Sequence, residues 1–198
     1  LMAVSWSKIT LDIQNLTVTP ACSTPGVPVD YCTGTMTWFP TSGSLDIYMT
    51  NTSHCELWSG SDQTLDETMT EVECTDAQGT WFSGDVKGFQ FNMDGIDIID
   101  ASGGSSDFMG ISFTSITVLA FSSTSEVIPE GAGILIQLSF SDIPGPDVCF
   151  SAQDCSSGAC TNVFSDAFGF DPGTAWGECL CPDLLDEDSD GDLDDGVV

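Results

Sequence analysis

Five aspartates near the carboxyl end have the spacing of a calcium-binding loop: Asp186, Asp188, Asp190, Asp192 and Asp194. Counted from Asp186, acids stand at positions 1, 3, 5 and 9, and Gly191 stands at position 6, where such loops turn sharply. Val197 occupies position 12, where a bidentate glutamate usually completes the ligand set. We therefore expect Ca²⁺ here, with reduced affinity or with a ligand from elsewhere. The alternative is a disordered acidic tail.

Nine cysteines indicate an oxidising compartment, and therefore an extracellular or cell-surface protein. Cys22 and Cys32 flank a turn-rich loop that we expect them to close. Cys55 and Cys74 bound an acidic stretch at 53–84, which a bond between them would staple at its base. Five more follow a proline- and glycine-rich linker: Cys149, Cys155, Cys160, Cys179 and Cys181. Zinc is the competing account of this cluster, but no histidine lies nearby, so disulfides are expected.

Two N-glycosylation sequons agree with an extracellular location. Asn15 begins Asn-Leu-Thr, and Asn51 begins Asn-Thr-Ser. No signal-peptide pattern is present at Leu1, so we expect a mature or trimmed chain. No apolar run approaches the ~18 residues that a membrane-spanning helix needs. We therefore expect a glycosylated chain that is held only by contacts with proteins or sugars.

The charge balance excludes several classes of partner and offers no catalytic centre. The chain has 31 acidic residues against two lysines, Lys8 and Lys87, for a net charge of -29. Nucleic acids and anionic membranes are excluded because their phosphates require Lys and Arg. The one histidine, His54, is expected to be a solvated loop residue, and no nucleophile motif accompanies it. With so many acids, a close carboxylate pair says nothing about glycoside hydrolysis. No enzyme is predicted.

Three aromatic residues in the acidic stretch, Trp58, Trp81 and Phe82, have two interpretations. As packing residues they would cap an edge of the fold, since buried aromatics are the commoner case. As a platform they would stack on the C–H faces of a sugar or contact a partner. The same stretch also predicts a short helix over 65–72.

The segment 87–140 predicts strand after strand. Two runs alternate apolar and polar residues with the period of half-buried antiparallel strands: Phe89-Phe91-Met93, and Ile134-Ile136-Leu138-Phe140. Leu45, Ile47 and Met49 share one face of a further strand, and another is expected at 35–39. Between the two runs, 116–121 is apolar on both faces, which predicts a central strand that is covered on both sides.

The first strand changes its apolar face partway along. Ile9, Leu11 and Ile13 lie on one face, whereas Leu16 and Val18 lie on the other. The change near Gln14 predicts a bulge, or a strand that passes from one sheet to the next. An alternative is that residues 1–14 leave their own domain and complete a neighbour's sheet by strand addition.

Several runs together resemble the second half of a cohesin-type domain: GFQFNMDG at 88–95, ASGG at 101–104, TVLAFS at 117–122 and IPEGAGILIQLSF at 128–140. The resemblance covers roughly 35–143 with an insertion near 53–84, and it implies an antiparallel jelly-roll β-sandwich. The later cysteines resemble the first five of an EGF-like module, which implies pairing of Cys149 with Cys160 and of Cys155 with Cys179, and leaves Cys181 to a partner elsewhere. The aspartate tail resembles the calcium repeats of dockerins and thrombospondin type 3 segments.

The expected organisation is therefore an all-β chain in four parts. These are an N-terminal strand at 1–19, a sandwich at 20–143, a small cysteine-rich appendage at 144–182 and a calcium-binding tail at 183–198. The expected function is structural: copies of the chain would assemble head to tail into an extracellular filament. The alternative is a cohesin-type binding or adhesion module for a dockerin-like segment or a polysaccharide. A hydrolytic enzyme is the least supported of the three.

Overall fold

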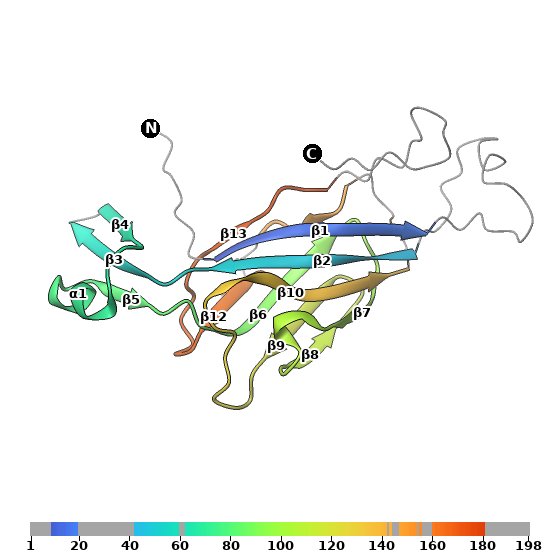
Figure 1. The fold of residues 1–198 in the computed structure, drawn as a ribbon. Helices are drawn as coiled ribbons and strands as arrows, with labels where there is room; N and C mark the ends of the chain where they lie inside the picture. Colours follow the sequence, from blue (N-terminus) through green and yellow to red (C-terminus); the bar gives the residue numbers. More distant parts are fainter. Residues whose placement is uncertain are drawn as a thin grey trace, which may run out of the picture.

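The fold is an all-β sandwich of two five-stranded sheets, with a small third sheet that projects from one end (Figure 1). The structure is a computed structural model that describes residues 9–19, 42–59, 62–141, 143, 147–153, 155 and 160–180. The strand predicted at 35–39, the aspartates of the tail, Cys22, Cys32 and Cys181 lie outside these residues. In the described part, no helix is long and apolar enough to cross a membrane.

The first sheet has the order β13-β1-β2-β10-β7. Its strands are β13 (Thr174–Trp176), β1 (Ile9–Thr19), β2 (Ser42–Asn51), β10 (Gly131–Phe140) and β7 (Ile98–Ser102). Neighbours are antiparallel except for β13, which runs parallel to β1. The predicted run in β2 has its expected face, because Leu45, Ile47 and Met49 are all buried.

The second sheet has the order β11-β6-β9-β8. It also includes β12, which pairs with β6 along the same edge as β11 does. Its strands are β11 (Cys149–Phe150), β6 (Val86–Asp94), β9 (Thr117–Phe121), β8 (Gly110–Phe113) and β12 (Val163–Asp166). Phe89, Phe91 and Met93 of β6 all enter the core, as their alternation predicts. In β10 the face shifts at a bulge between Ile134 and Ile136, so Leu135 is buried and Ile134 is only half-buried.

The core between the sheets combines side chains from distant parts of the chain, from Ile9 to Phe164. The largest fully buried ones include Phe91, Phe140, Phe164, Leu11 and Ile47. Full burial of one such side chain stabilises the fold by about 1.5–3 kcal/mol. Phe164 belongs to the cysteine-rich segment, so that segment contributes to the sandwich core, and its strands pair in both sheets.

The first strand contains the predicted bulge. The register of β1 against β2 shifts between Gln14 and Thr17, and Asn15 has a φ of 51°. Because the bulge adds one residue, the next apolar side chain, that of Leu16, packs against the core. From Ile9 onward β1 lies within the sheet of its own chain, between β2 and β13.

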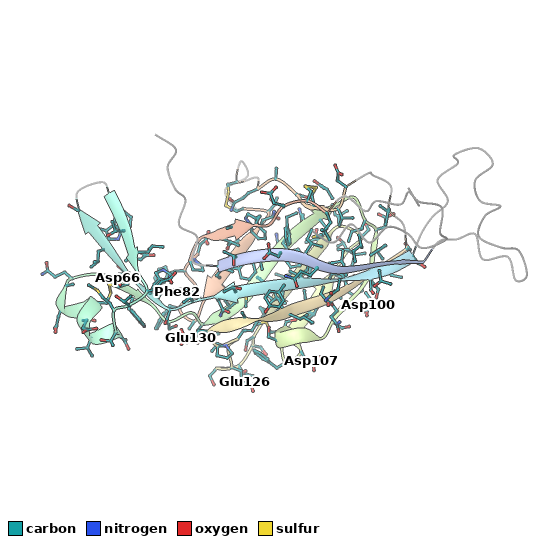
Figure 2. The ribbon with its side chains drawn as sticks, turned by 45° about the horizontal axis from the view of Figure 1, so that its top comes forward. Asp66, Phe82, Asp100, Asp107, Glu126 and Glu130 are labelled. Carbon is teal, nitrogen blue, oxygen red and sulfur yellow. A yellow bond between two sulfur atoms is a disulfide. The ribbon has the colours of Figure 1, made fainter. Side chains whose placement is uncertain are left out.

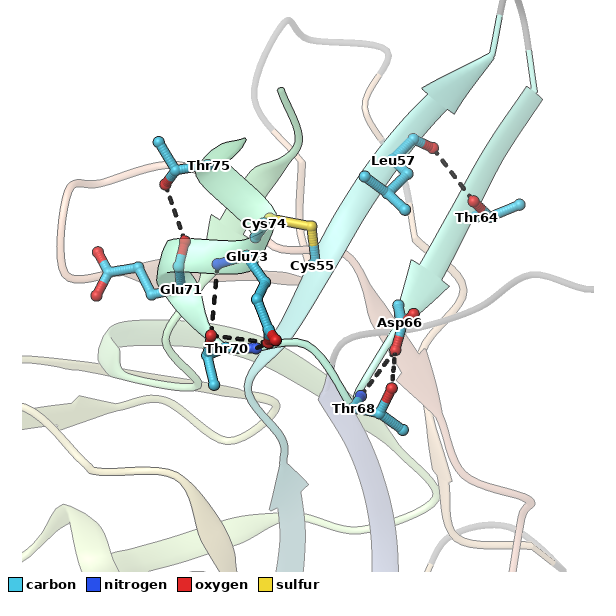
Figure 3. Close-up of a disulfide and its surroundings, with 10 residues drawn as sticks. All are labelled: Cys55, Leu57, Thr64, Asp66, Thr68, Thr70, Glu71, Glu73, Cys74 and Thr75. Carbon is cyan, nitrogen blue, oxygen red and sulfur yellow. Dashed lines mark hydrogen bonds between the residues drawn. A yellow bond between two sulfur atoms is a disulfide. The ribbon is translucent and has the colours of Figure 1, made fainter. Parts of the chain in front are cut away.

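The small sheet is formed by the excursion at 53–84. Its order is β4-β3-β5, with β3 (His54–Ser59), β4 (Asp62–Asp66), β5 (Thr80–Phe82) and helix α1 (Glu71–Asp76). The helix predicted at 65–72 was misplaced, because Thr70 and Glu73 form a capping box that starts it later (Figure 3). The Thr70 backbone N–H and hydroxyl lower the pKa of the Glu73 carboxyl.

The disulfide between Cys55 and Cys74 joins β3 to α1, as the sequence predicted (Figure 3). The pairing implied by the EGF-like resemblance is wrong. The bonds join Cys149 to Cys179, and Cys155 to Cys160. Two hydrogen bonds between Val148 and Leu180 explain the difference, since they place Cys149 and Cys179 with their Cα atoms 4.4 Å apart.

Candidate binding surface

The outer side of the second sheet carries large apolar side chains that no described residue covers. We call this surface the β9 face and define it by Leu119 and Phe121 of β9, with their neighbours Gln90, Ser112 and Val163. The register places these neighbours on the same side of the sheet. Leu119 is 38% exposed and Phe121 is 53% exposed. The prediction that 116–121 is covered on both sides is therefore wrong, because only Val118 and Ala120 face the core.

Phe121 has a glycine on each neighbouring strand, and the one on β8 leaves space beside its ring. The register pairs Phe121 with Gly88 on β6 and with Gly110 on β8. A Cβ atom on Gly88 would lie 3.5 Å from the Cβ of Phe121, and one on Gly110 would lie 3.7 Å from its carbonyl oxygen. Gly110 is exposed, so a partner can contact Phe121 from that side of its strand, whereas Gly88 is buried and a Cβ atom on it would lie 3.1 Å from the Oγ of Ser165.

A turn with two more phenylalanines borders the β9 face. Asp166 ends β12, and its Oδ1 accepts hydrogen bonds of 2.8 Å from the backbone N–H groups of both Phe168 and Phe170. These bonds fix the turn and leave Phe168 82% exposed and Phe170 71% exposed. The preceding residue, Ser165, pairs with Gly88 beside Phe121, so the turn lies at the Phe121 end of the face.

The aromatic trio of the excursion does not form one platform. Phe82 is buried at the root of the small sheet, where Figure 2 shows it meeting the sandwich. Trp81 lies on the opposite side of β5, since successive strand residues alternate. Trp58 is 60% exposed near the far end of β3. A flat sugar platform made of all three residues is therefore excluded, and Phe82 has the capping role.

His54 is not the solvated loop residue that was predicted. It is 2% exposed at the start of β3, its Nδ1 lies 2.9 Å from the carbonyl oxygen of Thr52, and its ring tilts against that of Phe82. The excursion brings His54 over the end of the core, which a single sequence does not reveal. Among the described residues, no three His, Cys, Asp or Glu side chains group as a metal site.

The two sequon asparagines lie in different environments. Asn51 is 2% exposed, and its Nδ2 donates to the carbonyl oxygens of Gly84 and Pro129. A glycan would replace one of these hydrogens, so the structure contradicts glycosylation of Asn51. Asn15 is exposed, and its Nδ2 donates only to Asp46 among the described residues, at 2.7 Å. Its amide keeps a hydrogen for a glycan to replace.

We therefore expect glycopeptide mass spectrometry of the protein, expressed through the secretory pathway of a eukaryotic host, to find sugar on Asn15 and none on Asn51. Enzymatic removal of N-glycans in heavy-oxygen water marks each occupied asparagine by its mass. An Asn15→Gln variant provides the control, since it should carry no N-glycan at either position. Sugar on Asn51 of folded protein would contradict the hydrogen bonds described here.

Comparison with known proteins yields a likeness and no family assignment. No family model matches the chain, and no curated protein matches it. Among solved structures, the chain is similar to a type III cohesin module from the cellulosomal ScaE cell-surface anchoring scaffoldin of Ruminococcus flavefaciens. The identity is 15%, the TM-score is 0.38 and 86% of each chain is covered. At these values the likeness carries no argument about function, so the proposals below rest on the residues of this chain.

Proposed function

We propose that the chain is a non-catalytic extracellular module that binds a protein segment on its β9 face. The observation that carries this proposal is the exposure of Leu119 and Phe121 on a sheet face, with Phe168 and Phe170 at its end. Contiguous exposed apolar side chains mark interaction sites, and aromatic residues dominate the energetics of such sites. The disulfides favour the extracellular setting.

The charge of the chain defines the chemistry of the partner. A net charge of -29 repels acidic partners and attracts those with cations around their contact surface. The partner we propose is an apolar segment flanked by Lys, Arg or bound Ca²⁺. A dockerin-like calcium segment with basic flanks combines these features, and the cohesin-type resemblance of the sequence implies the same class.

Replacing Phe121 by serine should weaken binding of such a segment at least tenfold, because a central aromatic contact contributes about 2 kcal/mol or more. The probes are a panel of calcium-loaded dockerin-type segments chosen for basic flanks, titrated by calorimetry. Val72→Ser is the matched control, since Val72 is 69% exposed on α1, away from the face. The proposal fails if no segment binds, or if polysaccharides bind and Phe121→Ser leaves their affinity unchanged.

A second proposed function is that of a glycosylated, calcium-binding subunit of an extracellular filament. The supporting observation is the charge of the N-terminal segment. Residues 1–11 contain no acid and include Lys8, one of only two lysines, whereas the rest of the chain is acidic. Opposite charges favour a head-to-tail contact between this segment and another copy. Filaments in electron micrographs of the purified protein would support this function, and monodisperse particles would contradict it.

A further inference from the structure

We propose that the open edge of β10 is the acceptor site for residues 1–8 of a second copy of this chain. The inference rests on the filament function proposed above and identifies the surface that would receive the N-terminal segment. It involves the opposite sheet from the β9 face, so the two surfaces can be tested separately.

Among the described strands, the first half of β10 has a neighbour on one side only. β2 pairs along its length, but β7 pairs only from Gln137 to Phe140. A short 3-10 turn at Gly104–Ser106 lies beside the middle of β10, where Ser105 donates to the carbonyl oxygen of Ile134 at 3.2 Å. The stretch from Gly131 to Gly133 therefore has no described strand on its second side, and such an edge is a template for strand addition.

The backbone groups of Ala132 point toward this open side. The carbonyl of Ile134 points away from β2, because it accepts from Ser105. In an antiparallel pair, residues two apart direct their N–H and C=O groups to the same side. Ala132 therefore presents both groups to an incoming strand, and its side chain is exposed.

A pocket lies beneath the open edge and would receive a side chain of that strand. Met49, Ile128, Pro129 and Ala132 line it, together with Gly131 and Gly133. A Cβ atom on Gly133 would meet no atom within 4 Å, so the absence of a side chain there leaves the space open. An added strand gains affinity from backbone hydrogen bonds and specificity from such pockets.

The N-terminal segment fits this acceptor in charge and in pattern. Met2, Val4 and Trp6 alternate with small or polar residues, so one of them can enter the pocket while its neighbours face outward. Glu130 is exposed beside the pocket, and hydrogen bonds from the Ser53 side chain and from the Ser53 backbone N–H, the latter 3.1 Å from its Oε2, keep the pKa of its carboxyl below the usual range. Its carboxylate attracts Lys8. Figure 2 shows Glu130 near Phe82, at the end of the sandwich from which the small sheet projects.

A second copy is the expected donor because β2 separates the segment from the acceptor in its own chain. Ile9, Asn51 and Gly131 lie in one row across the first sheet, so residues 1–8 precede β1 at the end where β10 begins. At Asn51 the chain leaves β2 for β3 at this same end. Reaching the free edge would require the segment to cross about three strand spacings, ~14 Å, around that connection.

The test uses two leucine substitutions, of which the second is the control. Gly133→Leu fills the acceptor pocket, and Val72→Leu introduces the same side chain on α1, where Val72 is 69% exposed and does not line the pocket. Sedimentation velocity of the full chain should show self-association that Gly133→Leu weakens at least tenfold and that Val72→Leu leaves unchanged. Equal association of Gly133→Leu and the unsubstituted chain would overturn the proposal.

A peptide measurement separates the acceptor site from the filament. A fluorescent peptide with the sequence of residues 1–8 should bind a chain that begins at Ile9 and retains all of β1, and Lys8→Glu in the peptide should weaken binding. This arm uses unsubstituted acceptor, so it stands even if Gly133→Leu impairs folding. Peptide binding without filaments would support the acceptor site and reject the filament function. Failure of the peptide to bind, or equal binding of Lys8→Glu, would reject the acceptor site.

Discussion

Replacing Phe164 by alanine should lower the free energy of unfolding of the whole sandwich by about 3–5 kcal/mol, the usual cost of removing a buried phenylalanine. Phe164 is fully buried, and its ring centroid lies 5.5 Å from that of Phe89 and 6.0 Å from that of Trp176. Because Phe89 belongs to β6 and Trp176 to β13, the cavity would remove contacts to both sheets. The loss should therefore appear as one cooperative transition at a lower denaturant concentration.

Phe168→Ala is the matched control for this experiment. It removes the same side chain four residues later, from a turn where the ring is 82% exposed. Its effect on stability should be within about 0.5 kcal/mol, as for other surface positions. Two separate unfolding transitions, with only the smaller one sensitive to Phe164, would show instead that the cysteine-rich segment folds on its own.

The sequence alone reveals little about how the second half of the chain folds. Cysteine spacing resembled an EGF-like module, and spacing alone cannot determine which cysteines meet. The actual pairs depend on strand contacts between distant segments, such as the bonds of Val148 with Leu180. Phe164 lies between Cys160 and Cys179 and has no local signature of a core residue, so its place in the sandwich emerges only from the pairing of β12 with β6.

Periodicity succeeded where one face of a strand meets the core. The alternation in β2 and β6 predicted the buried sides of both strands, and the change of face in β1 predicted the bulge at Asn15. These features are local, since period-two alternation requires no knowledge of which strands are neighbours.

Periodicity failed at β9 because a strand that is covered on both sides and a strand with one exposed side can have the same apolar sequence. Leu119 and Phe121 would be buried if a further layer covered the second sheet, and they are exposed because none of the described residues does so. Only the layer arrangement distinguishes the two cases. The same limit applies to Asn51, whose sequon is intact although its amide is buried between two carbonyl groups.

Removal of the Cys55–Cys74 bond is expected to destabilise the small sheet selectively. The bond spans 19 residues, and closing a loop of this size contributes about 3 kcal/mol in the chain-entropy model. Both cysteines are fully buried, so Cys55→Ala with Cys74→Ala is preferable to serine, which would bury unsatisfied hydroxyl groups. Of the described side chains in β3, β4, β5 and α1, only that of Phe82 belongs to the core of the sandwich, so the sandwich should remain folded without the bond.

Hydrogen exchange provides the readout because it resolves local opening. Amides of β3, β5 and α1 should lose about 100-fold in protection, the equivalent of ~3 kcal/mol, while those of β2 and β10 keep theirs. The paired control, Cys155→Ala with Cys160→Ala, opens a loop with a sequence separation of only 5 and should leave the small sheet unchanged.

Gly79→Ala tests the surroundings of the Cys55–Cys74 bond without removing sulfur, because its Cβ would lie 2.5 Å from the Sγ of Cys55. Equal loss of protection in β10 would mean that the excursion and the sandwich unfold as one unit. If the variant with Cys55→Ala and Cys74→Ala still binds the peptide of residues 1–8, the pocket beside β10 does not depend on this disulfide.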